Sequence, residues 1–131
     1  MSALDDAPHV HADDRAAWRA WLEASHATVG GAWLVTWRPG SGRVGLDYEA
    51  AVEEALCFGW VDSTGGRVDD ERRKLYFAPR KPRSAWAASN KARVERLIAE
   101  GRMAPAGLAA IERAKANGSW EILDAVERLE V

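Results

Sequence analysis

The sequence predicts a single α+β domain in which a small, mainly antiparallel three-stranded sheet packs with four to five helices. A chain of 131 residues suits one domain with one hydrophobic core. Its seven tryptophans, more than a chain of this length usually carries, can supply large side chains to that core. Segments with the hydrophobic periods of strands and of helices follow one another along the chain, without an internal repeat.

The N-terminal part predicts an arm, a helix and a strand. Residues 1–11 are polar and aperiodic, so we expect a flexible arm in front of one domain over residues 12–131. Asp13 is a suitable N-cap for a helix that ends before Gly30–Gly31. The next strand is indicated by alternating β-formers: Trp33, Val35 and Trp37.

The middle of the chain predicts a second helix and a β-hairpin. Asp47 can cap the helix, and its three acidic side chains are expected to face water: Glu49, Glu53 and Glu54. Two β-rich segments, residues 60–68 and 74–78, are expected to pair through a polar turn at residues 69–72. A tighter turn at Gly65–Gly66 is the competing placement.

The C-terminal part predicts further helices. A rigid basic connector, residues 80–83, leads to Ser84, which can cap a helix that runs to Glu100. Pro105 and Gly118 bound a fourth helix. A last short helix is expected from Ser119 as its cap and from three buried residues: Ile122, Leu123 and Val126.

Positive charge is concentrated in the middle of a chain that is acidic overall. The net charge is −2, but residues 67–102 carry 11 Lys or Arg against 5 Asp or Glu, whereas residues 1–66 carry 4 against 10. A local basic field of this kind attracts anions even on an acidic protein. The acidic flanks can equally neutralise it.

The composition predicts a cytoplasmic location. The single cysteine, Cys57, excludes an internal disulfide, and the N-terminus has neither the basic start nor the apolar run of a signal peptide. No apolar stretch approaches the ~20 residues of a membrane-spanning helix. We therefore expect a reducing compartment and no membrane insertion.

Four segments resemble the YdeI/OmpD-associated family: residues 55–63 (ALCFGWVDS), 69–72 (DDER), 77–86 (FAPRKPRSAW) and 93–103 (RVERLIAEGRM). Residues 31–35 and 48–55 are also similar to the upstream part of that family. The family is associated with bacteriocin protection and stress resistance, so the resemblance implies a cytoplasmic protein of stress or antimicrobial-peptide tolerance. It implies no particular reaction, ligand or cofactor.

A polar cluster is expected around Asp62. Alternation places Asp62 on the same strand face as Trp60, and a buried carboxylate needs a cation or several hydrogen-bond donors. Asn90, on the apolar stripe of the predicted third helix, has a similar need. We expect Asp62 and Asn90 to share one cluster with Ser63 at its edge, either as a structural network or as a functional pocket.

The basic connector predicts an anion site. Three cations precede Ser84 at an expected helix N-terminus, where free amides would converge with them on one point. The alternative is a solvated basic surface paired with the acidic flanks. Together with the polar cluster, the connector gives the candidate ligand-binding set: Trp60, Asp62, Ser63, Arg80, Lys81, Arg83, Ser84, Trp86 and Asn90.

The tryptophans allow two interpretations. Four of them are candidates for an aromatic pocket: Trp33, Trp37, Trp60 and Trp86. Such stripes usually belong to the core, so we expect at least two of the four to be core residues. Trp120 is expected to cover the edge of an apolar cluster.

Enzyme chemistry has little support in the sequence. Cys57 lies near the C-terminal end of a helix, where the helix dipole disfavours a thiolate, so we expect an inert core thiol. No histidine offers a convincing base for a nucleophile: His9 and His11 lie in the arm, and His26 near a helix end. Metal-binding and cofactor motifs are absent, and we expect neither group. One catalytic alternative uses Asp62 as an acid or base beside Arg80 and Arg83.

Residues and resemblance together predict a non-catalytic protein that binds an anionic small molecule or a protein partner through the basic segment 72–96. The Asp62-centred enzyme is the first alternative. A nucleic-acid-binding module is the second, with Trp86 or Tyr76 for stacking and five cations for the backbone: Arg72, Arg73, Lys74, Arg93 and Arg96. The acidic pI of about 5.9 and the lack of a nucleic-acid-binding motif argue against it.

Overall fold

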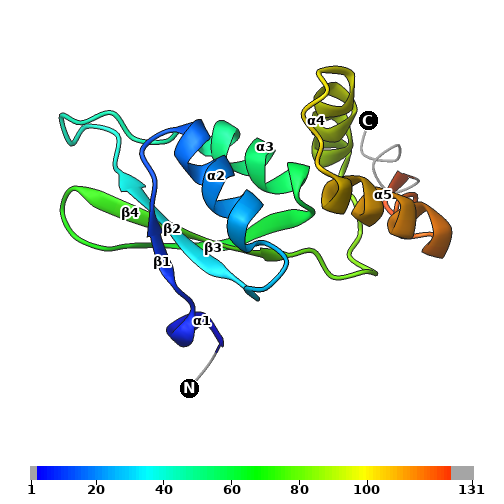
Figure 1. The fold of residues 1–131 in the computed structure, drawn as a ribbon, viewed down its shortest axis with the longest axis horizontal. Helices are drawn as coiled ribbons and strands as arrows, with labels where there is room; N and C mark the ends of the chain where they lie inside the picture. The colour runs from blue at the N-terminus through cyan, green and yellow to red at the C-terminus, as the bar shows by residue number, and fades with distance from the viewer. Residues whose placement is uncertain (1–2, 125–131) are drawn as a thin grey trace.

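The computed structural model of the protein describes residues 3–124 and shows an α+β arrangement (Figure 1). In chain order, the elements are α1 (Ala3–Asp6), β1 (His9–His11), α2 (Arg15–Ser25), β2 (Ala32–Trp37), α3 (Tyr48–Cys57), β3 (Trp60–Arg67), β4 (Arg72–Pro79), α4 (Ala88–Ala99) and α5 (Pro105–Asn117). Helices α2 and α3 lie against the sheet, and α4 and α5 stand beside α3 at one end of the molecule.

The sheet is four-stranded and mixed, so the predicted three-stranded, mainly antiparallel sheet lacked one strand and its parallel pairing. Its order is β1-β2-β4-β3, and the additional strand β1 pairs parallel with β2 at one edge. The amide of Trp33 donates to the carbonyl of Pro8, and that of Ala12 donates to the carbonyl of Val35. Because β1 spans only three residues and lacks a hydrophobic alternation, its sequence carries no strand signal. The described part of segment 1–11, interpreted as an arm, thus contains α1 and β1.

The predicted hairpin is confirmed. β3 and β4 pair antiparallel and are joined by the polar turn after Arg67, where the Asp69 carboxylate accepts the amides of Glu71 and Arg72. The competing turn at Gly65–Gly66 was wrong, because both glycines lie inside β3, just after a shift in its pairing register. The predicted strand at residues 33–37 is also confirmed as β2, which lies next to β4.

The two helices on the sheet begin at acidic caps. Asp47 caps α3 by accepting the amide of Ala50, as predicted. For α2 the cap is Asp14, which accepts the amide of Ala17, whereas Asp13 pairs with His11 instead. The choice between two adjacent aspartates depends on where the chain leaves β1, and that strand was not predicted.

Helix α4 begins later than the sequence predicted. Ser84 does not cap it, because residues 80–87 remain outside the helix and Ser84 closes a turn by donating its amide to the carbonyl of Lys81. The residue before α4 is Ala87, whose side chain cannot cap. The bounds of α5 match the prediction, with Pro105 at its start and Gly118 left-handed (φ 86°) after its end.

Helix α5 packs very closely on the end of α3. A Cβ added to Gly107 would lie 2.3 Å from the carbonyl oxygen of Cys57, so only glycine allows this approach. Gly59 has φ 76° and faces Ala106 and Ala110 of α5. These contacts fix α5 next to the start of β3 and to the end of β4.

The core is built around tryptophans. Trp18, Trp60 and Trp86 are fully buried, and Trp33 is nearly so, which confirms that at least two of the four pocket candidates are core residues. Trp120 packs on Trp86 with 5.0 Å between ring centroids, as expected for a residue that covers a cluster edge. No helix within residues 3–124 is long and apolar enough to cross a membrane. The last short helix predicted after Ser119 was wrong in its described part, because residues 118–123 form turns and Ile122, expected to be buried, is 63% exposed. Val126 lies outside the described residues.

Candidate functional site

The predicted polar cluster around Asp62 does not form in the described structure. Asp62 is half-buried, and its carboxylate accepts a hydrogen bond from Tyr48 at 2.8 Å. Asn90 instead accepts a hydrogen bond from Arg93, one turn further along α4. Ser63 is exposed. The two polar residues therefore belong to separate sites, because α4 begins after Ala87 and lies against α3 rather than against the hairpin.

The Tyr48–Asp62 pair is a surface contact between α3 and β3. The hydrogen bond to Asp62 raises the pKa of the Tyr48 hydroxyl, with a further contribution from burial. Tyr48 itself is 42% exposed. Within residues 3–124, no hydrogen bond or ion pair joins Asp62 to Arg80 or Arg83, so the geometry gives the Asp62-centred enzyme no support.

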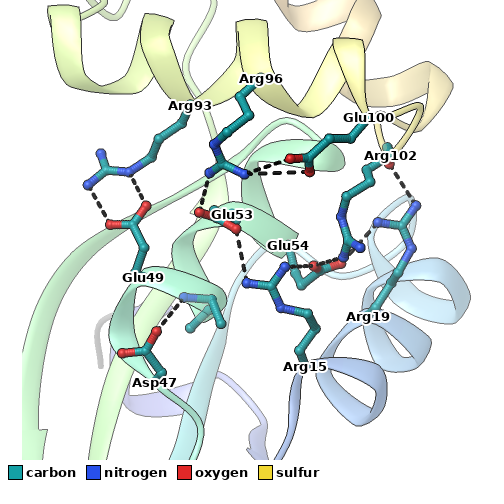
Figure 2. A network of polar contacts seen from close by, with 12 residues as sticks. Arg15, Arg19, Asp47, Glu49, Glu53, Glu54, Arg93, Arg96, Glu100 and Arg102 are labelled. Atoms are coloured by element: carbon teal, nitrogen blue, oxygen red, sulfur yellow. Dashed lines mark hydrogen bonds and ion pairs between the residues drawn. The ribbon is translucent and has the colours of Figure 1, made fainter.

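The largest charged cluster lies on α3, at residues that were predicted to face water (Figure 2). Glu53 is 5% exposed and Glu54 is 0% exposed. The prediction was wrong for both, because it assigned charged residues to the outer face of an isolated helix. Their partners come from α2, from α4 and from the loop after α4, which lie far from α3 in the sequence.

Four arginines neutralise these two carboxylates. Glu54 accepts from Arg19 at 2.9 Å and from Arg102, and Arg15 lies 3.4 Å from it. Glu53 accepts from Arg15 at 2.9 Å and also from Arg96. We call these six residues, Glu53, Glu54, Arg15, Arg19, Arg96 and Arg102, the buried ion network. Charge-assisted hydrogen bonds to these two carboxylates thus join α3 to α2, to α4 and to the loop after α4.

Much of the predicted basic stripe is engaged in such contacts. Arg96 belongs to the buried ion network, Arg93 binds Glu49 through two nitrogens at 2.7 and 2.9 Å, and Arg72 binds Asp69. The two candidate stacking residues are also poorly accessible, with Trp86 2% and Tyr76 8% exposed. These contacts leave less free charge and ring surface for a nucleic-acid strand than the sequence indicated.

Arg80 behaves differently from the other predicted site residues. Its side chain is buried, with 8% exposure, and it stacks on the Trp86 ring at 4.0 Å. One guanidinium nitrogen donates to the carbonyl of Ala85 at 2.5 Å, while its Nε has no hydrogen-bond partner. It forms no ion pair with a described residue, and burial lowers its pKa. Burial of a guanidinium without a neighbouring carboxylate costs free energy of folding.

Arg80 lines a hollow of about 300 Å³ on the surface between the hairpin and α5. A second basic residue, Arg113 of α5, lines the same hollow and forms no ion pair with any residue between 3 and 124. His26, at the end of α2, lies in the wall as well. Its remaining walls are mostly apolar: Phe58, Gly59, Trp60, Pro79, Ala106, Ala109 and Ala110. We call this region the Arg80 hollow.

The anion site predicted at the helix N-terminus is not present in that form. Lys81 and Arg83 are exposed, and Ser84 lies four residues before the start of α4. Of the predicted set, Arg80 and Trp60 line the hollow, and the Trp86 ring stacks on the Arg80 guanidinium. The sequence did not identify His26, Phe58 or Arg113 as its neighbours, since α2, α3 and α5 meet there only in the folded chain.

The remaining reactive side chains fit structural roles. Cys57 is fully buried, and burial raises the pKa of its thiol, as expected for an inert core cysteine. The described residues contain no group of three or more His, Cys, Asp or Glu side chains that could hold a metal ion. His9 and His11, placed in the arm by the sequence, lie on β1.

Comparison with known proteins gives a family without an assigned activity. No curated protein and no solved structure shows significant similarity to this chain. One family model, described as a domain of unknown function (DUF8412), matches residues 10–110. This match spans β1 to the first half of α5, and therefore includes the buried ion network and most of the walls of the Arg80 hollow. The chain belongs to the DUF8412 family.

Proposed function

We propose that this protein is a non-catalytic binding protein that takes up a small anionic molecule in the Arg80 hollow. As the resemblance to the YdeI/OmpD-associated family implies, it would act in the cytoplasm in stress or antimicrobial-peptide tolerance. The binding region is then smaller than the basic segment 72–96: it consists of Arg80 and the other residues that line the Arg80 hollow.

The buried, uncompensated guanidinium of Arg80 carries this proposal. The four arginines of the buried ion network lie against two carboxylates. Arg80 meets a carbonyl and an indole ring instead, beside a hollow that admits a ligand. A carboxylate or phosphate there would supply the missing negative charge, and Arg113 would add a second cation.

The test is a binding measurement on purified protein at constant ionic strength. Sodium phosphate, sulfate, acetate and benzoate replace chloride in a thermal-unfolding series, and isothermal titration then follows any anion that raises Tm. A ligand at 100 times its Kd stabilises the folded state by about 2.7 kcal/mol. We expect at least one of these anions to stabilise the wild type and to lose this effect in Arg80→Met.

Arg83→Met is the matched control, because Arg83 is an exposed arginine of the same connector that does not line the hollow. It removes the same charge from the chain and should respond to anions like the wild type. An equal response of Arg80→Met and wild type would place the binding elsewhere and overturn the proposal. The absence of stabilisation by every anion of the series would overturn it as well.

A further inference from the structure

A second hollow adjoins the Arg80 hollow. It has a volume of about 440 Å³ and shares three wall residues with the first: His26, Phe58 and Ala106. Small-molecule sites usually occupy roughly 300–1,000 Å³, so each hollow alone is small, whereas the pair offers room for a longer ligand. We call this region the Phe58 hollow.

The Phe58 hollow has a different chemical character. Its apolar wall is formed by the ring of Phe58, by Ala104 just before α5, and by Pro105 and Ala106 in the first turn of α5. The two charged residues in its wall, Arg19 and Glu23, pair with each other at 3.2 Å. Arg19 also binds Glu54 and lies over the Phe58 ring at 5.1 Å. Because these charges are already satisfied, the Phe58 hollow favours an apolar group rather than a second charge.

His26 lies between the two hollows. Its Nδ1 is 2.7 Å from the carbonyl oxygen of Leu22, so Nδ1 carries the hydrogen, because a carbonyl can only accept. The ring packs against Phe58 with 5.0 Å between centroids. Its Nε2 has no partner among residues 3–124 and is left available to a polar atom of a ligand near the junction.

We propose that the ligand of the Arg80 hollow is an amphipathic anion, with a carboxylate or phosphate head between Arg80 and Arg113 and an unbranched apolar tail in the Phe58 hollow. This inference rests on the proposed function and specifies the chemical class of its ligand. The cations of the Arg80 hollow, unpaired among residues 3–124, lie beside the apolar wall of the Phe58 hollow. A molecule with one anionic end and one apolar end is complementary to both.

Titration calorimetry with ligands of graded tail length tests this pairing. Acetate, butyrate, hexanoate and octanoate form one series, and methyl, butyl and hexyl phosphate form the other, all below their critical micelle concentrations. Burial of one methylene raises affinity by up to about fourfold, so Kd should fall steadily with tail length until the hollow is filled. Comparison of the two series at equal tail length identifies the preferred head group.

Pro105→Glu is the variant that distinguishes binding of the apolar tail from binding of the anionic head group. Pro105 lines the Phe58 hollow but not the Arg80 hollow, and a glutamate in the first turn of α5 is favoured by the helix dipole, so the fold should persist. Leu108→Glu is the matched control, because Leu108 is 42% exposed on the same helix and lines neither hollow. We expect Pro105→Glu to abolish the gain with tail length while short anions bind as before, and Leu108→Glu to retain it.

The possible outcomes separate this inference from the proposed function. Arg80-dependent binding that does not change with tail length would refute the amphipathic ligand and leave anion binding in place. Tail-dependent binding that survives in Arg80→Met would show adsorption to an apolar surface and would refute both. A tail-length gain that Pro105→Glu leaves intact would place the tail outside the Phe58 hollow and overturn the inference.

Discussion

Arginine side chains occupy both the buried ion network and the Arg80 hollow, but in the part of the chain that the structure describes they bind carboxylates only in the network. In the network, Glu53 and Glu54 accept hydrogen bonds from four guanidinium groups that reach them from three segments of the chain. At the hollow, Arg80 has an indole ring, one carbonyl and no acid among residues 3–124. The first arrangement is complete within the chain, whereas the second becomes electrostatically complete only with a ligand.

This difference predicts opposite responses to mutation. A group that completes an internal network contributes to stability, and its removal leaves buried partners uncompensated. A group whose charge has no internal partner contributes little net stability, because its desolvation offsets its contacts, and such residues are typical of sites kept for function. Four substitutions with progressively smaller expected effects on stability test this difference.

Glu54→Gln should have the largest effect. The substitution removes the charge that three arginines share, and we expect the free energy of unfolding to fall by about 3 kcal/mol, since loss of one partner of a buried pair costs about 3–5 kcal/mol and these arginines are partly hydrated. Urea unfolding followed by tryptophan fluorescence measures it. A loss below about 1 kcal/mol would show that the network does not hold α2, α3 and the loop after α4 together.

Arg80→Met should have a much smaller effect on the ligand-free protein. The variant loses the stacking on Trp86 and the hydrogen bond to Ala85, but it also removes the cost of burying an unpaired cation. We expect these terms to cancel to within about 1 kcal/mol in the same urea experiment. A loss comparable to that of Glu54→Gln would assign Arg80 a structural role and contradict the comparison.

Glu49→Gln provides a matched acid on the same helix. Glu49 binds Arg93 through two hydrogen bonds, which lower its pKa, but its side chain is 46% exposed. Solvent screens such a pair, so we expect a loss of less than about 1 kcal/mol. If Glu49→Gln and Glu54→Gln destabilise the protein equally, burial is not what distinguishes the network from surface ion pairs.

Asp69→Asn should have the smallest effect on stability, and this effect should disappear on the acid limb of the stability profile. The Arg72 guanidinium, together with the amides of Glu71 and Arg72, lowers the pKa of Asp69 from 3.8 to about 2. Because the folded pKa is the lower one, the contribution of Asp69 is complete above about pH 4 and is lost as the pH falls toward 2. Thermal unfolding between about pH 2 and pH 6 should show a shallower acid loss in Asp69→Asn than in the wild type. Identical slopes would contradict this assignment.

Local sequence signals were sufficient for several elements of the fold. The cap at Asp47, the polar turn after Arg67 and the bounds of α5 are specified by neighbouring residues, and all three were predicted. β1 was not, because three residues without alternation become a strand only when β2 provides a partner. The start of α4 was also missed, because Ser84 lies in a turn whose course follows the packing of Arg80 and Trp86.

The candidate site was predicted only in part, for a related reason. The sequence singled out Arg80 but gave it the wrong neighbours, since Lys81, Arg83 and Ser84 are adjacent in the chain and not at the hollow. His26 and Arg113 carried no signal, because a histidine near a helix end and an arginine on a helix surface are ordinary in isolation. Their convergence depends on Gly59 and Gly107, which allow α5 to approach the end of α3.

Local sequence features were enough to predict an α+β fold with a tryptophan-rich core, an acidic chain with a basic middle segment, and a buried cysteine. Composition, periodicity and capping are local properties, so they can be recognised before the chain is folded. Among the described residues, tertiary contacts determine which charges are neutralised. They bury Glu53 and Glu54 among four arginines and leave Arg80 without an acid, because pairing depends on contacts between segments distant in sequence.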